Sequence, residues 1–236
     1  MCTASWRFGE GGYELFFNRD ESVRRGRARA PEVVDLGGVR GLAPTDADAG
    51  GTWLGVNEHG LALALLNAWD LRVDPRAPRS RGLLVRDLLA CANAAQALAR
   101  LAREDLAHYR GFTLLALAPE EGASVRLWDG RELVVRPAER PLASSSLDGG
   151  RARSERQALF ERLTLGAAEP ARATLARFHA SHEPERGPWS PCMHRAEAAT
   201  VSASQVRVTP REIALRYADG PPCASPFGDW LTLPRR

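Results

Sequence analysis

The sequence at residues 2–21 reads CTASWRFGEGGYELFFNRDE. Two runs rich in aromatic and other apolar residues, 3–8 and 13–18, flank the turn sequence Gly9-Glu10-Gly11-Gly12. This pattern is typical of a β-hairpin, in which a glycine-rich turn joins two strands. We therefore expect an antiparallel ribbon that returns residue 18 to the neighbourhood of residue 3.

Further hairpins and two groups of helices are expected along the rest of the chain. Strands are predicted at residues 53–57, 61–67, 112–118, 124–128, 132–136, 200–208 and 212–217. Ser80 and Asn93 have side chains that cap helices, and a helix is predicted after each of them. Two more helices are predicted at residues 152–165 and 170–179. Residues 21–51, rich in Arg, Gly, Pro and Asp, are expected to form a long surface excursion.

This order of elements predicts an α+β fold. Strands joined by hairpins make antiparallel sheets, and helices grouped between blocks of strands must cover sheet faces. Two packed antiparallel sheets with helical layers outside them are therefore expected. A doubly wound nucleotide-binding fold is disfavoured, because no G-x-G-x-x-G or Walker sequence follows a predicted strand. Since we find no linker, internal repeat or low-complexity tract, residues 1–236 are expected to form one domain.

The composition excludes several classes of function. The 32 basic and 29 acidic residues give a net charge of +3, which is too small to indicate a nucleic-acid partner. The chain has no lysine, so a Schiff-base lysine and a P-loop lysine are impossible. The longest apolar run, residues 61–66, is far shorter than the ~20 residues of a membrane span. Residues 1–12 lack the apolar stretch of a signal peptide, and a cytoplasmic protein is expected.

Cys2 directly follows Met1. If Met1 is removed, one residue carries both a thiol and a free α-amine. The thiol ordinarily titrates near ~8.5 and the amine near ~7.7–8.0, so the amine can accept the thiol proton at neutral pH. The residue would then be a nucleophile that carries its own base. The plain alternative is an inert cysteine at the second position.

The polar sequence Asn18-Arg19-Asp20-Glu21 ends the second predicted strand, so the hairpin brings it beside Cys2. Asp20 can hold the protonated amine, and Arg19 can favour the thiolate or bind a substrate carboxylate. Because side chains alternate along a strand, Asn18 and Asp20 share one face, and Arg19 and Glu21 share the other. The alternative is a solvated strand end that pairs with the arginines at positions 24, 25, 27 and 29.

Four short motifs occur in the first third of the chain: M-C-T at residues 1–3, N-R-D-E at 18–21, G-T-W-L-G-V-N at 51–57 and S-R-G at 80–82. Together they resemble the signature of the NRDE family, which includes a eukaryotic transport and Golgi organisation protein. More distantly, the start of the chain is similar to the N-terminal-nucleophile cysteine amidases, the bile-salt and penicillin V hydrolases. That resemblance implies a four-layer αββα sandwich.

The amidase resemblance also implies roles for individual residues. Cys2 matches the nucleophile, Asp20 the aspartate near it, and Asn67 an asparagine whose side-chain amide lines the oxyanion hole. By its position alone, Asn67 is equally a strand-end residue that caps a turn. The amidase arginine stands three residues before the aspartate, where this chain has Phe17. Arg19 therefore takes that role only if the strand is repositioned.

Three further residues are candidates for substrate binding. Ser145, within Ser144-Ser145-Ser146, stands where NRDE sequences tend to have an asparagine after a serine. Arg195 is the nearest candidate for the C-terminal arginine of the amidases. Asn18 belongs to the polar strand end beside Cys2.

These roles imply a hydrolase or acyltransferase that acts on a non-peptide amide bond of a small molecule, without a cofactor. The rival expectation is a binding or carrier protein that keeps the fold and uses its pocket for an apolar or haem-like ligand. A fold alone is compatible with both. A catalytic Cys2 should react faster with an acyl electrophile than Cys91, Cys192 or Cys223, whereas a carrier should show no such ranking.

A second group of chemistry-bearing residues lies later in the chain: His179-x-x-His182, Cys192-x-His194 and Cys223. A zinc site can be drawn from them. Structural zinc, however, prefers four ligands on tight loops, and no cysteine pair has finger spacing. The wide spacing of the four cysteines favours reduced thiols in a cytosolic chain. Buried or turn-capping roles are therefore expected, and no metal.

Overall fold

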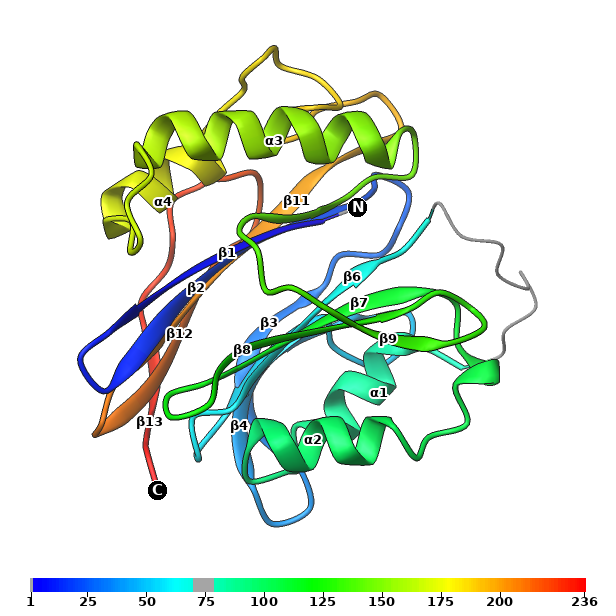
Figure 1. Cartoon of the computed structure of the whole chain (residues 1–236), viewed down its shortest axis with the longest axis vertical. Coiled ribbons are helices and arrows are strands. Elements are labelled where there is room, and N and C mark those ends of the chain that lie inside the picture. The colour runs from blue at the N-terminus through cyan, green and yellow to red at the C-terminus, as the bar shows by residue number, and fades with distance from the viewer. Residues whose placement is uncertain (1, 70–78) are drawn as a thin grey trace.

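The computed structural model describes residues 2–69 and 79–236. Two antiparallel sheets pack against each other, and helices lie on the outer side of each (Figure 1). The first sheet has the strand order β10 (Leu142–Ser144), β1 (Cys2–Gly9), β2 (Gly12–Ser22), β11 (Ala198–Val208), β12 (Glu212–Ala218) and β13 (Leu231–Pro234). The second has the order β3 (Arg29–Asp35), β4 (Arg40–Thr45), β5 (Leu54–Asn57), β6 (Ala62–Asn67), β7 (Phe112–Ala118), β8 (Gly122–Trp128) and β9 (Leu133–Arg136).

The helical layers lie where the sequence predicts them. They contain α1 (Arg81–Leu88), α2 (Ala94–Leu101), the 3₁₀ turn η1 (Leu106–His108), α3 (Gly149–Thr164) and α4 (Arg172–Ala180). Helices α1 and α2 cover the second sheet, and α3 and α4 cover the first (Figure 1). The side chains of Ser80 and Asn93 accept hydrogen bonds from backbone N–H groups of α1 and α2, which confirms both predicted caps. The predicted α+β sandwich of antiparallel sheets and helices is confirmed.

The space between the sheets holds an extensive apolar cluster to which the first hairpin contributes heavily. Cys2, Ala4 and Trp6 on β1 belong to this cluster, whereas Thr3 and Ser5 hydrogen-bond with residues of the α3 and α4 layer. This is the two-residue alternation expected of a strand. Burying each large apolar side chain contributes about 1.5–3 kcal/mol. The hairpin is therefore held on both faces.

The prediction of a surface excursion at residues 21–51 is wrong. The segment contains β3 and β4, which extend the second sheet at one edge. Most residues of β3 are exposed or half-buried, and its pairing with β4 is irregular between Arg29 and Glu32. An edge strand with this composition lacks the alternating apolar pattern that sequence reasoning depends on. Its backbone pairing with β4 makes it a strand.

Two short strands, β10 and β13, were also not predicted. The pairing of β10 places Ser144 opposite Cys2 at the end of β1. A three-residue strand is too short to show any periodicity, so only its neighbours in space reveal it. Strand β10 nevertheless matters for the candidate site, because it places Ser144 beside Cys2.

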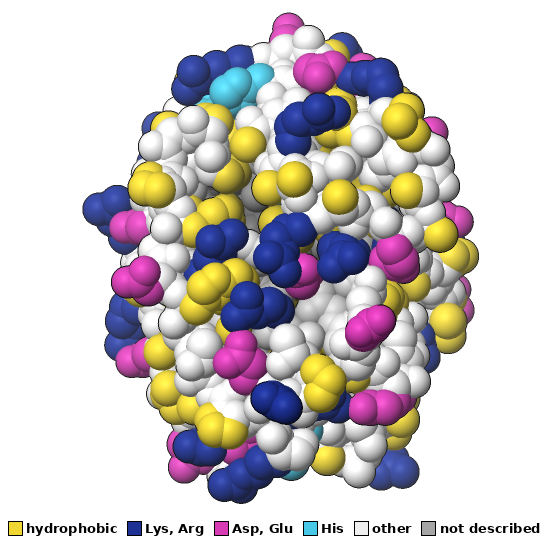
Figure 2. All heavy atoms as spheres, turned by 90° about the vertical axis from the view of Figure 1, so that its left-hand side faces the viewer, with side chains coloured by type: hydrophobic (Ala, Val, Ile, Leu, Met, Phe, Trp, Pro, Cys, Tyr) yellow, Lys and Arg dark blue, Asp and Glu magenta, His cyan; other side chains and the backbone are white. Residues whose placement is uncertain are grey.

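Figure 2 shows the face formed by the left-hand side of Figure 1. Arginine side chains gather near its middle, among acidic and hydrophobic side chains. This mixture agrees with the small net charge of +3. None of the helices in residues 2–69 and 79–236 combines the length and hydropathy that crossing a membrane requires.

Candidate active site

Cys2 lies at the wall of a cavity of about 420 Å³. Its side chain faces the space between the sheets, and the residue is 6% exposed. Its backbone nitrogen donates a hydrogen bond of 3.0 Å to Ser144 Oγ on β10. Burial raises the pKa of the Cys2 thiol, and the charge of Asp20 adds to the rise. The positive charge of the amino terminus, the backbone N–H of Asp20 and the charge of Arg19 offset only part of it. The thiol is thus protonated at neutral pH, and a base is needed to activate it.

Arg19 lines the same cavity as Cys2, because both side chains point between the sheets. Its guanidinium lies 4.2 Å from the centre of the Trp53 ring and 2.9 Å from Asp46 Oδ2, with Glu21 Oε2 at 3.6 Å. Two carboxylates and an aromatic face therefore hold this cation in place. Arg19 is a fixed positive group on the cavity wall.

Asp20 turns toward the α3 layer, as the predicted alternation requires. Its Oδ2 lies 3.4 Å from a terminal nitrogen of Arg156, and its Oδ1 accepts a hydrogen bond of 2.6 Å from the Thr200 hydroxyl. The side chains of Asp20 and Arg156 are both fully buried. Asp20 is therefore not part of the solvated pairing that was the alternative expectation for this segment, whereas Glu21 does pair with Arg25, at 3.8 Å.

Arg156 is a residue that sequence reasoning missed. Besides Asp20, its guanidinium donates hydrogen bonds to the Cys2 carbonyl, to Thr3 Oγ1 and to the Trp189 carbonyl. It therefore ties the start of β1 to the end of β2. A signal was available, because Arg156 shares one face of α3 with the buried residues Ala152 and Phe160. An arginine on the apolar face of a helix needs a buried acidic partner.

Asn67 is the last residue of β6 and lines the cavity from the second sheet. It also lines an adjoining cavity of about 740 Å³, so it lies where the two cavities meet. Leu65 on the same strand and Trp69 beyond it add apolar surface to the Cys2 cavity. The structure thus brings Cys2, Arg19, Asp20 and Asn67 to one cavity.

The other motifs that resemble the NRDE family converge on this cavity as well. Thr52, Trp53, Ser80 and Arg81 all line it. The Thr52 N–H donates a hydrogen bond of 3.0 Å to the Gly82 carbonyl, and a Cβ on Gly51 would lie 2.3 Å from the Gly82 carbonyl carbon. Glycine at position 51 is therefore required for this close backbone approach.

Arginine is the dominant charge on the cavity wall. Arg25, Arg79, Arg81 and Arg110 line it together with Arg19, against the carboxylates of Glu21 and Asp46. Burial and the neighbouring charge of Arg110 lower the pKa of Arg81 to about 10. A bound anion would offset both effects, so the wall is suited to a negatively charged group.

The three expected substrate-binding residues lie outside this cavity. The Asn18 amide donates to the carbonyl oxygens of His179 and Pro191, at 2.9 Å each. Ser145 lines the adjoining cavity, and its neighbour Ser144 is the hydroxyl that contacts Cys2. Arg195 pairs with Glu197 and lines a different cavity, which it shares with Asp20.

His179 is buried beneath the hairpin, where its Nε2 lies 2.8 Å from Ser5 Oγ. Burial, together with the charge of Arg156, lowers its pKa from 6.5 to about 3. The imidazole is therefore neutral at physiological pH and serves the fold rather than acid–base chemistry.

The low pKa of His179 predicts a loss of stability on acidification. The unfolded chain takes up this proton near pH 6.5 and the folded chain only near pH 3, so stability is present above pH 6.5 and is lost progressively below it. Between pH 7.5 and pH 5, this residue should cost the free energy of unfolding about 2 kcal/mol. The measurement is urea denaturation at both pH values for the wild type and for His179→Gln. The variant should show a drop smaller by about that amount, whereas His108→Gln, at an exposed position, should match the wild type.

Comparison with known proteins agrees with these motifs. The family model described as Transport and Golgi organisation 2 (TANGO2) matches residues 1–149. The chain belongs to the TANGO2 family. The resemblance to the NRDE signature is thereby confirmed, over a longer stretch than the motifs span. No curated protein matches this TANGO2-family chain in sequence.

Solved structures similar to this TANGO2-family chain include an acylase, an amidase and a bile acid hydrolase. Penicillin V acylase from Agrobacterium tumefaciens matches with a TM-score of 0.57 and 14% identity, over 93% of this chain and 84% of that one. The Caenorhabditis elegans orthologue of N-acylethanolamine-hydrolyzing acid amidase matches with a TM-score of 0.58 and 12% identity, over 87% and 92%. A mutant of conjugated bile acid hydrolase from Clostridium perfringens matches with a TM-score of 0.56 and 12% identity, over 99% and 92%. At these identities the TANGO2-family chain shares their N-terminal-nucleophile hydrolase fold.

Proposed function

We propose that this chain is an N-terminal-nucleophile cysteine hydrolase or acyltransferase. Its substrate would be a small molecule with a non-peptide amide bond and a negatively charged group. The observation that carries the proposal is the place of Cys2, at the head of β1 on a cavity wall that Asn67 shares from the other sheet. The similar structures are amidases, which supports a reaction at an amide bond.

The reaction begins once removal of Met1 frees the α-amine of Cys2. The amine takes the thiol proton, and the sulfur attacks the substrate carbonyl carbon to form a tetrahedral intermediate. The Asn67 amide N–H stabilises the oxyanion, a type of interaction that contributes about 2.7–4 kcal/mol in hydrolases. The ammonium group then protonates the leaving nitrogen, and the amine product departs. Water or another acceptor attacks the thioester and restores the thiol and the amine.

The environment of Cys2 orients its nitrogen for this proton transfer. Ser144 Oγ accepts a hydrogen bond from that nitrogen, and Arg156 binds the Cys2 carbonyl oxygen. Asp20, held by Arg156 and Thr200, carries a negative charge that acts on Cys2 and would favour the ammonium form of its amine. Because burial raises the pKa of the thiol, a base must take its proton, and the α-amine of the same residue can do so.

The arginine wall supports the choice of an anionic substrate. An anion beside Arg81 and Arg110 would form charge-assisted hydrogen bonds in a partly enclosed space. Trp53 and Trp69 on the same wall suit a carrier for an apolar or haem-like ligand, which is the second candidate function. The two candidates differ in whether Cys2 becomes acylated.

Mass spectrometry of the intact chain tests the proposal directly. The purified protein should lack Met1 and should gain one acyl group from p-nitrophenyl butyrate, mapped to Cys2 rather than to Cys91, Cys192 or Cys223. The p-nitrophenyl ester of succinic acid, which carries a carboxylate, should acylate Cys2 roughly tenfold faster. Retention of Met1, or equal labelling of all four cysteines, would favour the carrier.

A further inference from the structure

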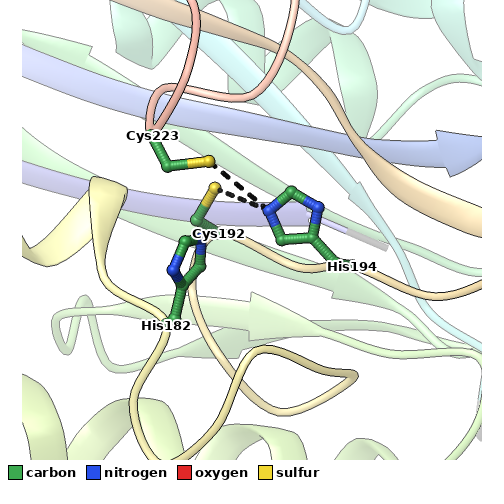
Figure 3. A group of neighbouring side chains, drawn as sticks. All are labelled: His182, Cys192, His194 and Cys223. Atoms are coloured by element: carbon green, nitrogen blue, oxygen red, sulfur yellow. Dashed lines mark hydrogen bonds between the residues drawn. The ribbon is translucent and has the colours of Figure 1, made fainter.

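Four side chains from two separate loops converge beyond the outer side of the first sheet. His182, Cys192 and His194 come from the loop after α4, and Cys223 comes from the loop after β12 (Figure 3). One ligand atom from each residue lies within 4.8 Å of all the others. His179, which sequence reasoning grouped with them, instead contacts Ser5.

We propose that His182, Cys192, His194 and Cys223 bind one zinc ion in a structural site. Two thiolates and two imidazoles are a ligand set that zinc takes in tetrahedral geometry. The two thiols would release their protons to solvent, so the two negative sulfurs would neutralise the ion. With four protein ligands, no position is left for a substrate or an activated water.

The distances within the cluster fit a zinc tetrahedron. Cys192 Sγ and Cys223 Sγ each lie 3.5 Å from His194 Nε2. Zinc held about 2.3 Å from sulfur and about 2.0–2.1 Å from nitrogen separates those two ligand atoms by about 3.6 Å in a tetrahedron. The observed spacing therefore needs little adjustment to accept the ion.

Hydrogen bonding within the protein does not account for the cluster as well as a metal does. One imidazole nitrogen makes one hydrogen bond, as donor or acceptor, yet two sulfurs approach His194 Nε2 equally closely. His182 Nε2 is buried and has no hydrogen-bond partner among the described residues. A buried polar nitrogen of this kind calls for a ligand. A cation at the centre would satisfy both histidines and both sulfurs.

The local chain direction explains how the loop presents its ligands. Cys192 and His194 stand two residues apart on one loop, and His194 forms a β-bridge with Ala199. Their side chains face one point, with Cys192 Sγ 3.5 Å from His194 Nε2. The sequence lacked the paired-cysteine spacing of a zinc finger because each of the two cysteines comes from a different loop.

The proposed zinc site adjoins the machinery around Cys2. The Met193 N–H donates a hydrogen bond of 2.8 Å to Thr200 Oγ1, and the Thr200 hydroxyl donates one of 2.6 Å to Asp20 Oδ1. Fixing Cys192 and His194 would thus fix Met193, and through Thr200 the carboxylate of Asp20. Zinc would also join the loop after α4 to the loop after β12. In this proposal, the four ligands are positioning residues for Asp20.

Metal analysis of the untagged protein tests this inference without any assay of activity. The chain, produced with zinc in the medium and dialysed, should hold about one zinc per molecule. Cys192→Ser and Cys223→Ser should lose it, whereas the matched variant Cys91→Ser should keep it. Cobalt exchanged into the wild type should give the intense visible bands of a tetrahedral site with thiolate ligands, and these should weaken in each ligand variant.

Two controls keep the test decisive if a variant folds poorly. Cys223 is exposed, so Cys223→Ser removes a ligand with little loss of packing. On the wild type itself, chelation should release zinc and lower the Tm. Zinc below about 0.1 per chain, or zinc unchanged in Cys223→Ser, would overturn the proposal. A Cys192–Cys223 disulfide in the freshly purified protein would overturn it too. Each of these outcomes is read from metal content, disulfide state or Tm, so the zinc proposal can fail while acylation of Cys2 stands.

Discussion

Replacing Cys2 with alanine is expected to abolish acyl transfer. If the thiol forms the covalent intermediate, Cys2→Ala should remove the initial burst of p-nitrophenolate from p-nitrophenyl butyrate and lower the steady-state rate at least about 10³-fold. Cys2→Ala should stay folded, because a buried thiol packs like a small apolar group. The measurement is stopped-flow absorbance with circular dichroism as the check of folding.

Two further proteins separate the thiol from the amine. Cys91→Ala removes a half-buried thiol beside the helices of the second sheet and should leave the burst intact. A chain with one extra residue before Cys2 keeps the thiol but lacks the free α-amine. It should lose the burst at pH 7 and regain alkylation by iodoacetamide as the pH rises toward the raised pKa of the thiol. A full burst in Cys2→Ala would refute the proposed nucleophile.

Replacing Arg156 with methionine is expected to destabilise the fold by about 3–5 kcal/mol. Methionine fills a similar volume, but it leaves the fully buried Asp20 carboxylate without its ionic partner. The penalty is that of an uncompensated buried charge rather than of lost packing. Urea denaturation followed by fluorescence measures the free energy of unfolding.

The matched control lies on the same helix. Arg162 is exposed and pairs with the exposed Glu183, so Arg162→Met should cost no more than about 1 kcal/mol. The double variant Arg156→Met with Asp20→Asn removes both charges and should recover much of the lost stability. If Arg156→Met alone lowers the free energy of unfolding by less than about 1 kcal/mol, Asp20 does not depend on Arg156 to compensate its buried charge.

Most of the regular structure could be predicted because its signals are local. The hairpin over β1 and β2 shows in the glycine turn between two apolar runs, and the caps at Ser80 and Asn93 act within three residues. The edge strand β3 could not be predicted, because polar residues at a sheet edge carry no burial pattern. Strand β10 could not be predicted for a different reason, because three residues are too few to show a periodic pattern.

The candidate site was only partly predictable. Cys2, Arg19, Asp20 and Asn67 do line one cavity, as the hairpin predicted for the first three and the amidase resemblance implied for Asn67. The placing of Arg19 and Asp20 on opposite faces of β2 also followed from the alternation of side chains. Arg156 was missed because its partner Asp20 is 136 residues away. That separation is bridged only when α3 packs on the first sheet.

The sequence by itself determined the antiparallel hairpins, the helix starts and the placing of a thiol beside a polar strand end. Each of these depends on residues a few positions apart, where backbone geometry alone sets the outcome. The tertiary structure alone decided which charge neutralises Asp20, and which cysteines and histidines share one centre. Such contacts join segments that are far apart in the sequence, so the sequence does not show that they meet. They meet only when burial of the apolar faces packs the sheets and helices together.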